Sequence, residues 1–479
     1  MYEDILQYAI DYGLSQGASY VEARYHKNTG SNIVVRNGAV VDAGISSKEG
    51  VGIRVIYEGA LAFSSTTDLT RKGVRRAVDK AISLARSSKP LIKEPHALSE
   101  ERVGRAKYDV VIKEKFEDVP LEDKIKVMVA LWKDLPKLLK ETKLVSLFEA
   151  YVESIEEKTL ITSDGAHIVS RVPRVFFEAS IVISHPQKGT LQRLIELGGS
   201  GGYEVFRTWN VEDVLSGEVR NIEPVLVRGV EPPKEPVDVV VGSEVVGLIV
   251  HESAGHPMEA DRIWGREAAQ AGESYVKPEM IGRERIGNEN ATVIDDPTIP
   301  GSYGFYLYDD EGVPARPRYI YYKGLINEPL HNRWSAAVFN TRSNAAARAM
   351  DFTSEPLVRM ANTYLEPGDC TFEELIEDIE LGVYVKSYME WNIDDIRWGQ
   401  RYVGLESYVI RKGELAEPVL YPALEFTTKS FYSSIVAKGK ELRFYTGTCG
   451  KGEPAQGVPV WFGGPDVRLS KMRVGVAPR

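Results

Sequence analysis

The sequence predicts an α+β protein, with a mixed helix and antiparallel-sheet N-terminal region followed by a large β-rich C-terminal domain. In the N-terminal half, runs of alternating apolar and polar residues joined by Asn-Gly and Asp-Gly pairs indicate antiparallel hairpins. After residue 236, short strand-like runs separated by turn residues dominate. A chain of 479 residues is also too long for one compact core, so several domains are expected.

The first predicted domain spans residues 1–105. It begins with a helix over residues 3–16, where apolar residues recur at helical spacing. A strand meander follows in the pieces "SYVEARYH", "SNIVVRNGAVVDAGIS" and "GVGIRVIYEGALAFSS", with turns at Asn37-Gly38 and Gly59. The amphipathic stretch "DLTRKGVRRAVDKAISLARSS", capped near Asp68, predicts a helix that closes this unit.

The second predicted domain spans residues 106–222 and repeats the plan of a helix followed by strands. Its helix is expected over residues 121–141, and Pro136 should kink it or end it early because proline cannot continue the hydrogen-bond ladder. The strands that follow, over residues 144–184, are expected to turn at Asp164-Gly165.

A glycine cluster lies late in this unit, and a proline cluster marks its boundary with the third predicted domain, residues 223–479. The stretch "GGSGGYE" from Gly198 lacks the Lys-Ser/Thr of a P-loop, so a flexible loop near a cleft is the preferred interpretation. The clearest boundary is the run "EPVLVRGVEPPKEPVDV", which contains Pro224, Pro232, Pro233 and Pro236.

Composition excludes several classes of protein. The formal charge of −10, with no dense Lys/Arg cluster, argues against a nucleic-acid partner. The most apolar stretch, "VDVVVGSEVVGLIV", is short and is interrupted by Asp238 and Glu244, so no membrane span is expected. Two distant cysteines and an acidic first segment unlike a secretory signal favour a cytoplasmic protein.

The stretch "IVHESAGHPMEAD", Ile249 to Asp261, carries the strongest chemical signal. It lies on a predicted helix that follows the strand "VDVVVG" and is capped by Ser243. Its histidines are five residues apart, which places them roughly 140° apart around a regular helix, too far to share a metal ion. They could do so only if the helix ends between them or widens into a π-bulge, and Gly255 is a natural place for such a distortion.

A third ligand would turn this pair into a metal site. Zinc in catalytic sites usually has three protein ligands and one open position. With His251, His256 and Cys449 as ligands, Glu252 is free to act as general base in amide hydrolysis. Other acidic residues remain as competing ligands or as partners of the histidines: Glu259, Asp261 and Glu273.

One alternative and two further interpretations accompany this one. His251 and His256 could be ordinary polar residues near a helix end, satisfied by local hydrogen bonds. Cys370 is interpreted as structural because it directly precedes a predicted capping box of Thr371 and Glu374. His331 is interpreted as a surface or loop histidine without a metal role.

Four segments together resemble the TldD/PmbA family of metalloproteases, also labelled modulators of DNA gyrase. They are "HESAGHPMEAD", "DDEGVPARPRYIYYKGLIN", "VRMANTYLEPGD" and "TCGKGEPAQGVPVWFGGPDVRLSKMRVG". The resemblance spans nearly the whole chain and implies a zinc-dependent peptidase that acts on unfolded or extended peptides inside a dimer. It implies His251, His256 and Cys449 as ligands of Zn²⁺, and Glu252 as catalytic base.

The resemblance also bears on partners and on substrate binding. Because all the metal-site positions are present, the chain resembles the TldD type, and it is expected to form a homodimer or a heterodimer with a PmbA-type chain. The segment "VRMANTY" supplies Arg359, Asn362 and Tyr364, polar side chains that could hold a peptide backbone or carboxylate or could instead pin a loop.

The sequence therefore favours a zinc metallopeptidase of the H-E-x-x-x-H type over two other hypotheses. One is a non-catalytic peptide-binding partner or modulator subunit of a family heterodimer. The other is a zinc amidase acting on a small molecule. A groove with exposed strand edges would favour peptides, and a closed cavity would favour the small substrate.

Overall fold

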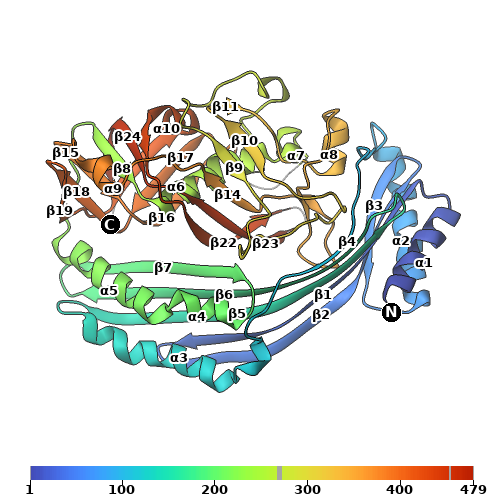
Figure 1. Ribbon diagram of the computed structural model, residues 1–479, viewed down its shortest axis with the longest axis horizontal. Helices are drawn as coiled ribbons and strands as arrows, with labels where there is room; N and C mark the ends of the chain where they lie inside the picture. Colours follow the sequence, from blue (N-terminus) through green and yellow to red (C-terminus); the bar gives the residue numbers. More distant parts are fainter. Residues whose placement is uncertain (1, 267–271, 453–454, 478–479) are drawn as a thin grey trace.

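The computed structural model describes residues 2–266, 272–452 and 455–477. Within these residues, the N-terminal half forms one long curved sheet of seven strands (Figure 1). Its order is β3-β2-β1-β5-β6-β4, and β7 also pairs with β6. The strands are β1 (Tyr20–Arg36), β2 (Ala39–Tyr57), β3 (Ala60–Thr66), β4 (Arg105–Asp109), β5 (Lys143–Thr162), β6 (His167–His185) and β7 (Gly189–Ser200).

The hairpins of this sheet turn where the sequence predicts, but the strands are longer than expected. Asn37 and Gly38 join β1 to β2 with φ of 51° and 73°, the left-handed backbone that a tight hairpin requires. The predicted meander divided each strand at a polar stretch. In the structure these stretches pair with each other, as Lys27 does with Glu49, because ladder hydrogen bonds need only the backbone.

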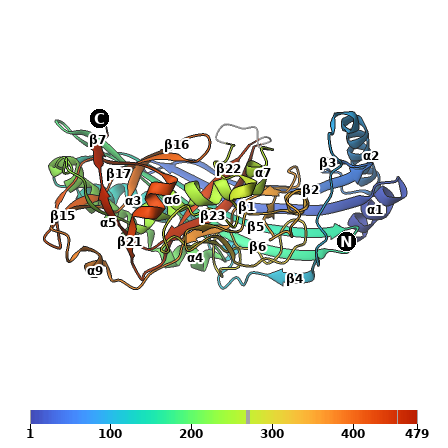
Figure 2. The same cartoon turned by 90° about the horizontal axis from the view of Figure 1, so that it is seen from above.

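Helices cover the sheet in two groups (Figure 1). Helices α1 (Tyr2–Ser15) and α2 (Arg71–Ser88) pack at one end of the sheet, and Figure 2 shows them at the end of the molecule farthest from the last strands. Helices α3 (Leu121–Asp134), α4 (Tyr203–Trp209) and α5 (Val211–Arg228) lie along the convex face.

The helix ends follow local chemistry. The cap of α2 is Thr70, whose side chain accepts a hydrogen bond from the Gly73 amide, two residues beyond the predicted Asp68. Helix α3 ends at Asp134 and tightens into a 3₁₀ turn over Leu135–Leu138, the early end expected from Pro136. Pro224 lies inside α5 and does not end it. The predicted domain boundary between residues 222 and 223 therefore falls within this helix, and it stays a prediction.

The predicted flexible loop at Gly198 is wrong. Gly198 and Gly199 are buried in the last part of β7, and the turn begins only at Gly201. A Cβ at Gly198 would lie 2.5 Å from the Cγ2 atom of Thr446, so this glycine gives room for the C-terminal domain to approach the sheet. No local pattern around Gly198 indicates that contact, because Thr446 is far away along the chain.

The described part of the C-terminal domain forms four sheets, which confirms the predicted α+β class. A six-stranded sheet has the order β11-β10-β9-β14-β23-β22: β9 (Val293–Asp295), β10 (Arg318–Tyr322), β11 (Leu325–Ile326), β14 (Asn362–Leu365), β22 (Arg443–Lys451) and β23 (Gln456–Gly464). A second has the order β19-β18-β15-β8-β24-β21: β8 (Val237–Val241), β15 (Leu381–Val385), β18 (Ser407–Arg411), β19 (Glu414–Pro418), β21 (Ile435–Lys438) and β24 (Val467–Met472).

Smaller sheets and short helices complete this domain. The four-stranded sheet is β16 (Tyr388–Ile393), β17 (Gly399–Gly404), β20 (Pro422–Thr427) and β25 (Val474–Val476), and a two-stranded one is β12 (Ala347–Arg348) and β13 (Leu357–Val358). The helices are α6 (Ser243–Val250), α7 (Ala260–Ile263), α8 (Arg333–Val338), α9 (Phe372–Ile376) and α10 (Thr428–Ser434). No helix among the described residues is long and apolar enough to cross a bilayer.

The C-terminal domain lies against the concave face of the curved sheet (Figure 1). Ion pairs between buried or largely buried side chains join the two. The Arg54 guanidinium contacts Glu22 on the neighbouring strand at 2.5 Å and Glu311 of the C-terminal domain at 2.7 Å. Lys158 of β5 contacts Asp310 at 2.9 Å. Because charges buried in such a seam must be paired, these contacts fix how the domain sits on the sheet.

Candidate metal centre

The histidine motif follows the short buried helix α6, but this helix is not capped as predicted. The N-cap residue is Gly242 rather than Ser243, and because glycine has no side chain, the helix lacks a side-chain cap. The Asp466 carboxylate instead accepts the Ser243 amide at 2.7 Å, while the Ser243 hydroxyl bonds to that of Tyr445. A carboxylate supplied from another part of the domain therefore satisfies the first turn.

A π-helical turn over His251–Gly255 continues α6, and a 3₁₀ turn over His256–Met258 follows it. The His256 amide donates to the His251 carbonyl, five residues earlier. This is the local widening that a five-residue spacing requires, because an i to i+5 turn brings both side chains to the same side. The two imidazole rings lie with centroids 4.9 Å apart and nearly perpendicular.

Side chains from distant segments hold this turn. The Ser253 hydroxyl donates to the Ile249 carbonyl at 2.6 Å and bonds to the Tyr432 hydroxyl at 2.8 Å. The Tyr321 hydroxyl donates to the Ser253 carbonyl at 2.9 Å. Backbone groups that a regular helix would satisfy thus find partners elsewhere, which makes the distortion stable.

Gly255 is needed in this turn for space rather than for conformational freedom. Its φ of −56° is open to any residue. A Cβ at this position would, however, lie only 1.9 Å from the Met360 sulfur. The turn therefore packs directly on Met360, closer than any larger residue would allow.

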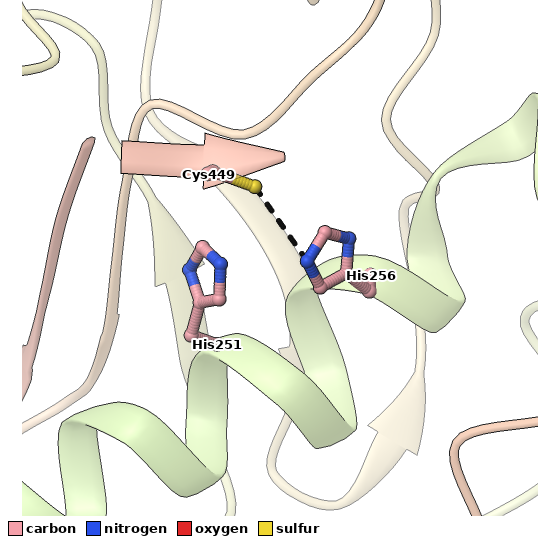
Figure 3. A group of neighbouring side chains, drawn as sticks. All are labelled: His251, His256 and Cys449. Carbon is pink, nitrogen blue, oxygen red and sulfur yellow. Dashed lines mark hydrogen bonds between the residues drawn. The ribbon is translucent and has the colours of Figure 1, made fainter. Parts of the chain in front are cut away.

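Cys449 completes a group of three possible ligands (Figure 3). It lies on β22, and its Sγ is 3.5 Å from His256 Nε2. One ligand atom from each of His251, His256 and Cys449 lies within 4.8 Å of the others, and all three residues are about 95% buried. The structure thus brings together the three residues that the sequence proposed as ligands, although Cys449 follows His256 by 193 residues.

The electrostatics favour a thiolate beside the imidazoles. Burial alone would raise the pKa of the Cys449 thiol, but His256, Arg359 and His251 together hold this pKa well below its usual range. Burial opposes the charged form of His251, yet the Cys449 sulfur outweighs it and raises the His251 pKa. A thiolate and two imidazoles form a donor set that zinc prefers.

Charged residues behind His256 hold its ring in place. His256 Nδ1 lies 3.1 Å from Glu259 Oε2, and the same carboxylate accepts from Arg262 Nε at 2.6 Å. Burial would raise the Glu259 pKa, but Lys451, Arg262 and His256 hold it well below the usual range. The Lys451 ammonium also donates to Asp261 at 2.8 Å. Contacts of this kind orient a metal-binding histidine.

These contacts bear on the competing ligands. Glu259 and Asp261 are both engaged with basic side chains and lie outside the group of three. Glu273 is exposed. The three acidic alternatives are therefore disfavoured as ligands, and Glu259 has instead the position of a partner to His256.

Glu252 lies in the same π turn and is 8% exposed. Its Oε2 atom pairs with the Arg397 guanidinium, which comes from the loop between β16 and β17. Sequence reasoning missed Arg397. It is 145 residues from Glu252, and no local pattern in "NIDDIRWGQ" indicates a role at this site.

The other predicted site residues do not converge on an open surface. Arg359 is fully buried and donates to the carbonyls of Cys449 and Gln456. Asn362 is also fully buried, and its side chain bonds to the Asp296 carbonyl and the Ser302 hydroxyl. Tyr364 is partly exposed and packs against Phe444. Burial thus favours Arg359 and Asn362 as supports of the strands around the site.

The structure also places the two residues that were interpreted as lying outside the metal site, His331 and Cys370. His331 lies in a loop as expected but is buried, and burial lowers its pKa to about 4. It bonds to Ser335 and is outside the group of possible ligands. Cys370 is partly buried, and the capping box that follows it, Thr371 with Glu374, is present.

Models of one family match three parts of this chain. Residues 234–476 match the model of the PmbA/TldA metallopeptidase C-terminal domain. Residues 21–85 match domain 1 of the same metallopeptidases, and residues 114–222 match their central domain. The first of these matches alone covers more than half of the chain.

Similar proteins extend over the whole length. A metalloprotease of Methanothermobacter thermautotrophicus is 30% identical, over 95% of each chain. A zinc metalloprotease TldD homolog of Saccharolobus solfataricus is 26% identical, over 96% of this chain and 97% of that one. The crystal structure of TldE from Thermococcus kodakarensis has the same fold, with a TM-score of 0.75 and 16% identity over 98% of this chain and all of that one.

Proposed function

Since this chain belongs to the PmbA/TldA family of metallopeptidases, we propose that it is a zinc peptidase that hydrolyses peptide bonds in unfolded or extended peptides. The observation that carries the proposal is the buried group of His251, His256 and Cys449, which the π turn gathers within 4.8 Å. Zinc itself is supported by the name of the Saccharolobus relative and by the donor set.

The residues present fit a zinc ion. In the part of the chain that the structure describes, His251 Nδ1 is buried and has no hydrogen-bond partner. Such an atom is costly unless a ligand satisfies it. We infer that His251, His256 and Cys449 would hold the ion. When bound, zinc would supply Lewis-acid polarisation of the scissile carbonyl and would lower the pKa of a water molecule.

The chain's own residues supply proton transfer and orientation. We assign to Glu252 the general base, which takes the proton from the attacking water and delivers it to the leaving amine. Glu259 fixes the ring of His256 through Nδ1, and the low pKa of Cys449 keeps its sulfur a ready ligand. Burial of the whole turn limits access of bulk water to this chemistry.

Peptides and a second subunit are the partners that we propose. Of the residues expected to hold substrate, Tyr364 is partly exposed and stays a proposed contact. Arg359 and Asn362 are buried and are better placed to support the strands around the site. The likeness to a TldE structure supports a PmbA-type chain as one possible partner, with a second copy of this chain as the other. We also keep a cytoplasmic location as part of the proposal.

The competing function is a non-catalytic peptide-binding subunit. A binding subunit has no need for a complete ligand set beside an acidic residue. Here His251, His256 and Cys449 lie together, and Glu252 is in the same π turn as His251. The same experiment distinguishes the two functions.

The test measures zinc per chain and cleavage of an unfolded protein, such as reduced and alkylated casein, on the same preparations. We expect nearly one zinc per chain and cleavage by the wild type. His251→Ala and Cys449→Ala should lose the metal, and Cys370→Ala is the matched control that should keep it. Glu252→Gln should keep the metal but lose at least about 100-fold in rate.

Three results would contradict the proposal or part of it. Wild-type protein without zinc after reconstitution would refute the metal site. Zinc-loaded protein that binds casein but does not cleave it, alone or with a PmbA-type chain, would favour the non-catalytic subunit. Cleavage by Glu252→Gln at the wild-type rate would refute the assigned base.

A further inference from the structure

The loop between β16 and β17 brings Arg397 to the candidate catalytic site from a separate sheet. Arg397 and Glu252 are each 8% exposed, and the guanidinium nitrogen Nη1 pairs with Glu252 Oε2. Among the described residues, this is the only side chain that bonds to the Glu252 carboxylate. The arginine thereby engages Oε2, one of the two oxygens of this carboxylate.

The backbone at Arg397 has an unfavourable conformation. Its φ of +68° lies in the left-handed region, which is unfavourable for a residue other than glycine or asparagine. Residues held in this way need support from their surroundings, and they concentrate at functional sites. The strain is therefore an observation independent of the ion pair itself.

Two residues provide the support. The Asp394 carboxylate accepts the amides of Trp398 and Gly399 at 2.7 and 2.6 Å, and the Asp394 carbonyl accepts the Arg397 amide at 3.1 Å. On the other side, the Thr428 hydroxyl donates to the Arg397 carbonyl at 2.8 Å. The loop is tied at both ends of the arginine.

One helix links this loop to the π turn. Thr428 is the first residue of α10, and Tyr432 of the same helix bonds to Ser253 in the turn that carries Glu252. One short helix of seven residues therefore contacts both the loop that carries Arg397 and the turn that carries Glu252.

We propose that Arg397 is a positioning residue for peptide hydrolysis. It anchors Oε2 of Glu252 and so directs Oε1 toward the water that attacks the peptide bond. This inference rests on the proposed function. An arginine suits the task because its planar guanidinium keeps its charge and fixes direction, whereas a lysine ammonium is a flexible point charge.

The experiment compares steady-state cleavage of an internally quenched peptide by zinc-loaded wild type, Arg397→Gln, Arg397→Lys and Arg401→Ala. Arg401 lies on β17 in the same hairpin and pairs with Glu390 and Glu425, so its loss is the matched control. We expect Arg397→Gln to lower kcat by about 10- to 100-fold with KM and zinc content unchanged, because a displaced base slows proton transfer. Arg397→Lys should recover part of this loss, and Arg401→Ala should behave as wild type.

Each peptide is tested with a free and with an amidated C-terminus. An increase of KM in Arg397→Gln only for the free carboxylate would mean that Arg397 binds the substrate terminus, which would overturn the proposal. An unchanged kcat would also overturn it, as would an equal loss in Arg401→Ala. These failures leave the proposed function intact if wild type cleaves and Glu252→Gln does not. Zinc-loaded wild type that cleaves neither peptide would refute both.

Discussion

Replacing Glu149 by glutamine should change how the stability of this protein depends on pH. Glu149 lies on β5 between Leu147 and Tyr151, which belong to the core under the helices of the convex face. Its side chain is fully buried, and neither carboxylate oxygen has a hydrogen-bond partner in the described structure. Burial raises the pKa of this carboxyl to about 8 from an ordinary value of 4.5.

The sign and size of the effect follow from this pKa. The folded state binds the proton more tightly than the unfolded chain does, so the stabilising contribution is complete below pH 4.5 and is lost as pH rises through about 8. Over that interval the free energy of unfolding should fall by about 1.4 kcal/mol per pH unit from this group alone, or about 5 kcal/mol in all. A glutamine side chain is neutral at every pH and carries no such cost.

The assay is urea unfolding of wild type and Glu149→Gln between pH 5 and pH 9. The difference between their free energies of unfolding should grow in favour of the variant as pH rises and level off above pH 8. Glu212→Gln, an exposed position in the first turn of α5, is the control and should show no trend. A constant difference across this range would refute the inference that Glu149 is protonated in the folded protein.

Three further predictions concern the packing around the metal centre and the domain seam. Gly255→Ala should destabilise the fold by about 1–3 kcal/mol because the new methyl group meets Met360, and Met360→Ala in the same chain should restore part of the loss in urea unfolding; an unchanged midpoint for the single variant would contradict this. Glu259→Gln should weaken zinc binding by about 10- to 100-fold, measured by competition with a chromophoric chelator, and unaltered affinity would mean that Glu259 does not orient the histidine. Glu311→Gln should cost about 3 kcal/mol in stability because Arg54 loses a buried partner, and a melting temperature equal to that of wild type would show that the seam tolerates the loss.

The elements that the sequence predicted well are those with local causes. Asn37-Gly38 and Pro136 act through the backbone of their own residues, so the turn and the early helix end are where they were expected. The π turn was deducible as well, because a spacing of five residues leaves few geometries in which His251 and His256 can meet.

What could not be predicted depends on contacts between distant segments. The cap of α6 comes from Asp466, and Gly198 is a strand residue only because Thr446 lies against it. Arg397 reaches Glu252 through a hairpin whose sequence contains no motif. In each case the decisive partner lies at least 145 residues away, and a single sequence carries no record of such pairings.

The strand that carries Cys449 has a consequence for the newly made chain. The cysteine follows His256 by 193 residues, so the ribosome adds it roughly 10 to 40 s later at typical rates of synthesis. Throughout that interval the two histidines and Glu252 have been made, but the ligand set is incomplete. The proposed zinc site therefore cannot be assembled before synthesis has passed β22, so the proposed peptidase activity can begin only after that point.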